Sequence, residues 1–115
     1  MVQFPPRADS AFLALADPTR RGILEHLGRR DATISDLAAR FEITLTGIKK
    51  HVNVLERSGL VTSEKVGRVR TCRLGPRRLE DEAAWIANYR QMVEARLDRL
   101  EELLERTDPA RITKG

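Results

Sequence analysis

Apolar residues recur at intervals of three and four through the first half of the chain, a pattern that predicts a series of short helices. Ser10 is expected to cap the first helix, and Asp17 is expected to cap the second, with Pro18 at its first helical position. Gly28 then marks the end of the second helix. The apolar residues of these two helices are Phe12, Leu13, Leu15, Ile23, Leu24 and Leu27.

Two further helices joined by a tight turn follow. Ser35 marks a third, short helix, and Thr44 is expected to cap a fourth helix that ends at Ser58-Gly59. The apolar residues of the fourth helix recur on one side and are Ile48, Val52 and Leu55. Its polar residues lie elsewhere on the circumference and are Thr46, Lys49, Lys50, Asn53 and Arg57. One face is therefore expected to pack, and the other is available to a partner.

The pattern changes after Leu60, where two runs rich in β-forming residues are separated by Val66-Gly67-Arg68, which predicts a β-hairpin. After Gly75-Pro76, apolar residues step by three and four to about Arg106, which predicts one long helix. These apolar residues are Trp85, Ile86, Tyr89, Met92, Val93, Leu97, Leu100, Leu103 and Leu104. We therefore expect a mainly α fold with a small β-hairpin and a long C-terminal helix.

The length of 115 residues corresponds to a single domain, expected at residues 10–106. Residues 1–9 are expected to form a flexible arm, and residues 107–115 a flexible tail. The N-terminus lacks the pattern of a secretory signal, no apolar run approaches the roughly 18 residues of a membrane span, and the single Cys72 has no internal disulfide partner. We expect a cytoplasmic protein without a membrane partner.

Charge is distributed unevenly along a chain of formal net charge +4 and sequence pI near 9.8, values that favour a polyanionic partner. The long helix is rich in acids, whereas cations gather around the hairpin, at Lys65, Arg68, Arg70, Arg73, Arg77 and Arg78. Two helices joined by a tight turn and followed by a basic hairpin suit double-stranded DNA. The second helix fits the major groove, and the cations of the hairpin meet the flanking phosphates.

Three stretches of the chain resemble family signatures. The stretch from Leu15 to Arg21, followed by Ile23-Leu24, and the stretch from Ile43 to Leu55, followed by residues 58–61, resemble the ArsR-type family of arsenical-resistance repressors. Gly67-Arg68 and Arg73-Leu74 are similar to the hairpin, or wing, of that family. The resemblance extends over residues 10–106. It implies a winged helix-turn-helix fold and a homodimeric repressor that binds an inverted-repeat operator.

The resemblance also implies which side chains contact DNA. Leu45, Thr46, Lys49 and Lys50 are expected to face the major groove, and Thr44 to cap the helix beside a phosphate. The full expected set is Thr44, Leu45, Thr46, Gly47, Lys49, Lys50, Asn53, Lys65, Arg68 and Arg70. Family members often carry Gln and Ser near the positions of Leu45 and Lys49, so their base preference does not transfer to this chain. Leu45 suits a thymine methyl group, and Lys49 or Lys50 a guanine or a phosphate.

The apolar stripe of the last helix is longer than one small domain covers, so a partner surface is expected. The resemblance implies that this helix packs with the first helix across a two-fold axis. The residues expected at the dimer interface are Phe12, Leu13, Val93, Leu97, Leu100 and Leu104. Trp85 and Tyr89 either take part in this packing or line a pocket for an unknown small-molecule effector.

The metal chemistry of the family is not expected in this chain. The cysteine pair of the family falls on Thr33 and Ser35, whose neutral hydroxyl groups are poor ligands for soft metals. The alternative family site on the last helix needs histidine, which that helix lacks. We expect no metal and no cofactor, and we interpret Cys72 as a small buried apolar residue rather than a redox sensor.

Several alternatives remain open at this point. Lys49 and Lys50 would also suit a solvated helix face. His51 is expected to be partly buried, with a hydrogen bond to backbone or to a phosphate, and His26 is expected to lie at the surface. The chain shows no phosphate-binding glycine loop and no nucleophile motif, so an enzyme is not expected. A helical protein-interaction module and a double-stranded RNA binder are the alternative functions.

Overall fold

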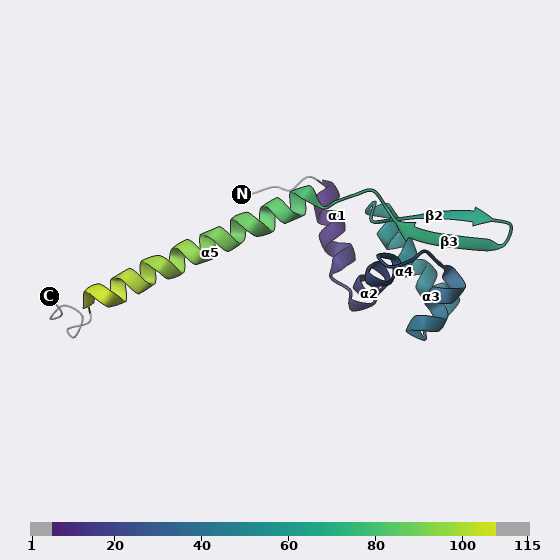
Figure 1. Ribbon diagram of the computed structural model, residues 1–115, viewed down its shortest axis with the longest axis horizontal. Helices are drawn as coiled ribbons and strands as arrows, with labels where there is room; N and C mark the ends of the chain where they lie inside the picture. Colours follow the sequence, from purple (N-terminus) through teal and green to yellow (C-terminus); the bar gives the residue numbers. More distant parts are fainter. Residues whose placement is uncertain (1–5, 108–115) are drawn as a thin grey trace. The chain divides into compact units, whose positions relative to one another are not determined.

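A computed structural model describes residues 6–107 of the chain, with side chains from Asp9 onward. Its helices and strands are α1 (Pro6–Leu15), α2 (Pro18–Leu27), β1 (Ala32–Thr33), α3 (Ile34–Phe41), α4 (Leu45–Arg57), β2 (Val61–Val66), β3 (Val69–Leu74) and α5 (Glu80–Thr107), and all except the short β1 are labelled in Figure 1. The chain forms two compact units, the first ending at Leu79 and the second beginning at Glu80. The mainly helical fold with a hairpin and a long last helix is therefore confirmed. The C-terminal tail, apart from Thr107, lies outside the described residues.

Side-chain caps fix where most of the short helices begin. Asp17 caps α2 by accepting a hydrogen bond from the backbone N–H of Arg20, with Pro18 in the first turn, and Thr44 caps α4, both as predicted. The predicted cap at Ser10 is wrong. The helix α1 begins at Pro6, so Ser10 lies inside it, and residues 6–9 belong to this helix rather than to an arm.

The cap of α3 is Thr33 rather than Ser35. The Thr33 hydroxyl accepts a hydrogen bond from the backbone N–H of Asp36, at 3.0 Å, and the Asp36 carboxylate accepts one from the backbone N–H of Thr33, at 3.2 Å. This reciprocal pair is a capping box, which satisfies two backbone donors at once. The hydroxyl at one of the two positions where the family has metal-binding cysteines thus has a structural role in this chain.

The hairpin belongs to a three-stranded antiparallel sheet in the order β1-β3-β2. Val66 pairs with Val69 at the tip, which leaves Gly67 and Arg68 as a two-residue turn with Gly67 at a φ of +61°. Glycine at the first position of such a turn suits the twist of the strands. The strand β1 is a correction to the predicted order of elements. It pairs Ala32 with Cys72 and is too short, at two residues, to show an alternating pattern.

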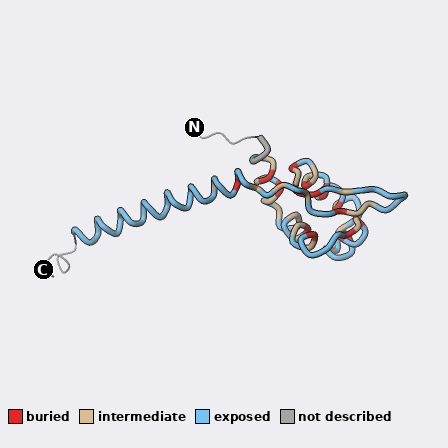
Figure 2. The backbone as a smooth tube through the Cα atoms, turned by 45° about the horizontal axis from the view of Figure 1, so that its top comes forward, coloured by how far each residue is buried: buried red, intermediate tan, exposed pale blue. Residues whose placement is uncertain are grey.

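The core of the first unit is built from α1, α2, α3, α4 and the sheet. Its largest fully buried side chains are Ile23, Leu37, Ile48, Val52, Leu55, Val61 and Cys72. The predicted inner face of α4 is thereby confirmed, and so is the burial of Cys72, where burial raises the pKa of the thiol above its usual value. Figure 2 shows the buried positions gathered in this unit, whereas exposed positions run along most of α5.

The two ends of the hairpin meet where it joins the rest of the first unit. The backbone N–H of Gly75 donates a hydrogen bond to the carbonyl oxygen of Leu60, at 2.9 Å, just beyond the last strand pair. A Cβ atom built on Gly75 would lie 2.5 Å from the carbonyl oxygen of Gly59, which is closer than van der Waals contact allows. Gly59 itself has a φ of +79°, so neither residue accepts a side chain without strain.

This close approach predicts that Gly75→Ala destabilises the first unit by about 1–3 kcal/mol, because backbone must move to make room for the methyl group. Gly28→Ala is the matched control, since Gly28 has a right-handed φ of −65°. We expect urea denaturation followed by circular dichroism to show a lower midpoint for Gly75→Ala and a midpoint close to wild type for Gly28→Ala. Equal midpoints for the two variants would contradict the prediction.

Candidate nucleic-acid interface

The outward face of α4 presents five of the ten residues predicted to contact DNA. Leu45, Thr46, Lys49, Lys50 and Asn53 are exposed, and Leu45 has half of its surface accessible although it is apolar. Because the inner face of the same helix is fixed in the core, these side chains have a defined direction. An exposed helix with a polar face and one exposed leucine is suited to the donors, acceptors and thymine methyl groups of a major groove.

Thr44 and Gly47 have structural roles at the start of α4. The backbone N–H of Gly47 donates a hydrogen bond to the Thr44 hydroxyl oxygen, at 3.1 Å. A Cβ atom on Gly47 would lie 2.7 Å from a methyl carbon of Ile43. The absence of a side chain at Gly47 therefore allows Ile43 and Thr44 to pack closely against the first turn of α4. Gly47 itself is half-exposed.

A cleft of about 510 Å³ separates the first turns of α3 and α4 from the wing. Its lining residues are Ile34, Ser35, Leu45, Lys49, Ser63, Lys65, Arg68 and Arg70. Five of these residues were predicted to contact DNA, and the structure brings them to one surface from two segments of the chain. Ile34, Ser35 and Ser63 were not predicted, since only the folded arrangement places the start of α3 beside the hairpin.

The cations of the wing have different surroundings. Lys65 and Arg68 are exposed near the hairpin tip, whereas Arg70 is half-buried. The Arg70 guanidinium forms an ion pair with the Glu56 carboxylate, donates from Nε to the Ser63 hydroxyl at 2.9 Å, and donates from Nη2 to the Asn53 side-chain oxygen at 3.3 Å. Lys65 and Arg68 therefore present their charge to solvent, and Arg70 is held within the protein.

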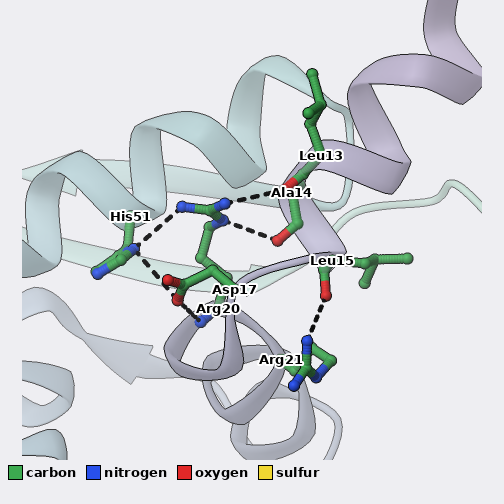
Figure 3. A network of polar contacts seen from close by, with 7 residues as sticks. All are labelled: Leu13, Ala14, Leu15, Asp17, Arg20, Arg21 and His51. Carbon is green, nitrogen blue, oxygen red and sulfur yellow. Dashed lines mark hydrogen bonds and ion pairs between the residues drawn. The ribbon is translucent and has the colours of Figure 1, made fainter.

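A second polar network joins α1, α2 and α4 (Figure 3). The Arg20 guanidinium donates from Nε to the carbonyl oxygen of Ala14, at 2.8 Å, and from Nη2 to that of Leu13, at 2.9 Å. Its Nη1 atom lies 3.4 Å from Nδ1 of His51, on α4. Carbonyl groups at the end of a helix have no partner within it, so Arg20 satisfies the end of α1 while contacting α4.

The two histidines differ from the surroundings expected for them. His51 is half-buried, as predicted, but its partners are the side chains of Arg20 and of Asp17, whose carboxylate lies 3.8 Å away, rather than backbone. His26 is half-buried rather than fully at the surface. Desolvation lowers the pKa of His26, and the positive charges of Arg40, Arg30 and Arg29 lower it further.

The second unit presents a row of apolar side chains along α5. Eight of them have exposed fractions between 39% and 68%, and they are Ile86, Tyr89, Met92, Val93, Leu97, Leu100, Leu103 and Leu104. The rings of Trp85 and Tyr89 stack on each other, with centroids 5.5 Å apart and planes inclined by 13°. In α1, Leu13 is exposed and Phe12 is half-buried.

Among the described residues, no helix is both long enough and apolar enough to cross a bilayer.

A short helix, a second helix with an exposed polar face and a basic wing beside it define a winged helix-turn-helix DNA-binding protein. Comparison with known proteins supports this class. Residues 15–64 match a family model described as a helix-turn-helix domain. The transcriptional repressor SdpR of Bacillus subtilis (strain 168) is 32% identical over 81 residues, which is 70% of this chain and 90% of that protein.

Two solved structures are similar over most of their length. An ArsR family transcriptional regulator, RHA00566, is 41% identical with a TM-score of 0.72, and the match covers 82% of this chain and 97% of that one. An ArsR-like transcriptional regulator from Rhodococcus sp. RHA1 is 35% identical with a TM-score of 0.71, and the match covers 89% of this chain and 94% of that one. The chain belongs to the ArsR family of transcriptional regulators, and it is a DNA-binding regulator.

The capping carboxylate of Asp17 predicts a pH dependence of stability. The backbone N–H of Arg20 lowers the pKa of Asp17, partly opposed by burial and aided by the charges of His51 and Arg20. A pKa that is lower in the folded state gives stability that is present above the unfolded pKa and is lost as pH falls through the folded pKa.

We therefore expect Asp17→Asn to show a smaller fall in Tm between about pH 5 and pH 3 than the wild type, because asparagine still caps the helix but does not titrate there. Glu101→Gln, at an exposed position on α5, controls for the loss of one carboxylate. Circular dichroism melts at each pH provide the measurement. If the Tm of Asp17→Asn falls as far as the Tm of the wild type, the Asp17 carboxylate does not contribute to the acid sensitivity of the fold.

Proposed function

We propose that this protein is a homodimeric repressor that binds an inverted-repeat operator and blocks transcription by occupying the promoter. The observation that carries the proposal is the cleft where Leu45 and Lys49 of α4 lie across from Lys65 and Arg68 of the wing. A helix and a cationic hairpin on one surface match the combination of major-groove contacts and flanking phosphate contacts. The name of the relative SdpR, a transcriptional repressor, supports the sign of regulation.

The proposed contacts divide by type. Leu45, Thr46, Lys49, Lys50 and Asn53 contact base edges or the adjacent backbone in the major groove. Thr44 and Gly47 form the start of the helix near a phosphate, and Lys65 and Arg68 contact the phosphates or sugars beside the site. Each phosphate contact by a cation contributes about 0.9 to the slope of log affinity against log salt concentration.

The proposed dimer follows from the apolar row on α5. Exposed apolar surface of this length on a charged helix is a frequent mark of a protein interface. We assign Val93, Leu97, Leu100 and Leu104 to this interface, together with Phe12 and Leu13 of α1. A two-fold dimer presents two recognition helices about one turn of DNA apart, roughly 34 Å, which requires two half-sites of inverted sequence. The protein acts in the cytoplasm, by binding and with no chemistry of its own.

Binding to duplexes tests the proposal directly. Fluorescence anisotropy compares a labelled DNA duplex from the promoter region of the protein's own gene with a random DNA duplex and an RNA duplex, over a range of salt concentrations. We expect tighter, salt-sensitive binding to the promoter duplex. Preference for the RNA duplex would favour the RNA-binding alternative, and absence of binding to every duplex would favour a protein-interaction module.

Replacing Lys49 and Lys50 together by Ala is expected to abolish the preference for promoter DNA over random DNA, because both lysines lie on the exposed face of α4. The fold should be unchanged, since neither side chain is in the core. Arg29→Ala with Arg30→Ala removes the same charge from exposed positions after α2 and serves as the control. A double lysine variant that protects the same operator as the wild type would overturn the groove assignment.

Leu100→Arg is expected to convert the dimer to monomer at micromolar concentration and to weaken operator binding, because a charged group replaces apolar area in the proposed interface. Gln91→Arg is the control, because Gln91 lies on the opposite face of the helix from Leu100. It adds the same charge and should leave the dimer intact. Sedimentation velocity measures the molecular mass of each variant. A tight Leu100→Arg dimer would show that the interface lies elsewhere.

A further inference from the structure

The wing of this protein is supported along only part of its length. The strand β1 pairs with Thr71 and Cys72 of β3, and within residues 6–107 no strand pairs with this edge of β3 beyond that point toward the tip. From Glu64 through Val69 every residue is exposed. A two-stranded hairpin is marginally stable by itself, so its direction depends on contacts at the place where the third strand ends.

Arg70 lies at this place, one residue beyond the end of the β1 pairing. Its guanidinium reaches Glu56 and Asn53 of α4 and Ser63 of β2, and the Ser63 hydroxyl in turn donates a hydrogen bond to the Glu56 carboxylate. Four side chains from α4 and from both strands of the wing thus form one hydrogen-bonded group, which we call the wing clamp. Every member of the wing clamp lies in the first unit.

The wing clamp differs from an ordinary surface ion pair. The Arg70 and Glu56 side chains retain 23% and 30% of their accessible surface, and the planar guanidinium makes several directed contacts at once. Arg73 and Glu64 form the contrasting pair in the same hairpin. Their side chains are 47% and 67% exposed and their charged atoms lie 3.8 Å apart, a geometry that contributes little.

We infer that Arg70 and Glu56 are positioning residues for DNA recognition, which hold the wing at a fixed angle to α4. The width of the cleft between Lys49 and the wing cations Lys65 and Arg68 depends on that angle. In this role Arg70 contacts Glu56 in the free and the DNA-bound protein, and it does not bind a phosphate. The inference rests on the proposed use of this cleft for DNA and adds the residues that set its dimensions.

The two possible roles of Arg70 predict opposite effects when Glu56 is changed. If Arg70 binds a phosphate, Glu56 competes for the guanidinium. Its removal then strengthens DNA binding and steepens the salt dependence by up to about 0.9. If Arg70 and Glu56 position the wing, removal of Glu56 lets the hairpin move, and specific binding weakens. The sign of the change therefore separates the roles.

The test compares Glu56→Gln with Glu64→Gln, a matched variant that removes one negative charge from the wing outside the clamp. Anisotropy with the promoter duplex should show Glu56→Gln binding about tenfold more weakly than Glu64→Gln, with their affinities for random DNA remaining similar. Hydrogen exchange of the amides from Lys65 to Arg70 should be faster in Glu56→Gln alone. Tighter promoter binding, or equal binding by the two variants, would overturn the inference.

Arg70→Lys provides a second measurement in case Glu56→Gln is poorly folded. Lysine retains the charge and binds phosphate well, but it cannot reproduce the fork of a guanidinium. We expect weaker promoter binding for Arg70→Lys, and no further loss when Glu56→Gln is added to it, because the two residues act as a unit. Wild-type affinity for Arg70→Lys would contradict the inference. Absence of promoter preference in the wild type would instead refute the proposed function itself.

Discussion

Burial of one side of α4 is the constraint on which the proposed DNA-binding surface depends. Ile48, Val52 and Leu55 have no accessible surface, and they hold the helix against α2, α3 and the sheet. Since successive side chains on a helix are about 100° apart, fixing these three fixes the directions of Lys49 and Lys50 as well. The orientation of the proposed DNA-contacting face is therefore a consequence of apolar packing on the opposite side of the helix.

Polar contacts complete what apolar packing leaves undetermined. Packing restrains the rotation of α4 about its axis. The Arg20 network in addition joins His51 of α4 to the backbone at the end of α1. The wing clamp, through Glu56 and Arg70, attaches the C-terminal part of α4 to the wing. Each contact uses a guanidinium with several partners, which resists reorientation better than a single hydrogen bond. Arginine thus acts as a structural residue at both of these places.

The sequence predicted those parts of the molecule that follow from local rules. Periodicity placed α2, α4 and α5, and the caps Asp17 and Thr44 were assigned correctly because each precedes an apolar run. Local rules failed where the determining partner lies far away in the chain. The strand β1 exists because Ala32 meets Cys72, and the difference between Arg70 and Arg68 exists because Glu56 lies opposite only one of them. Neither pairing leaves a periodic trace in the sequence.

The turn at Gly67-Arg68 is separated from the core by the strands on either side of it. A Cβ atom on Gly67 would have no neighbour within 4 Å, and the strand pairs next to the turn are exposed on both sides. Changes of turn residues other than Gly67, whose φ of +61° disfavours a side chain, consequently leave the folding energy of the first unit nearly unchanged. Arg68, which we propose contacts DNA from this turn, can therefore differ between related proteins while the interior of the first unit stays the same.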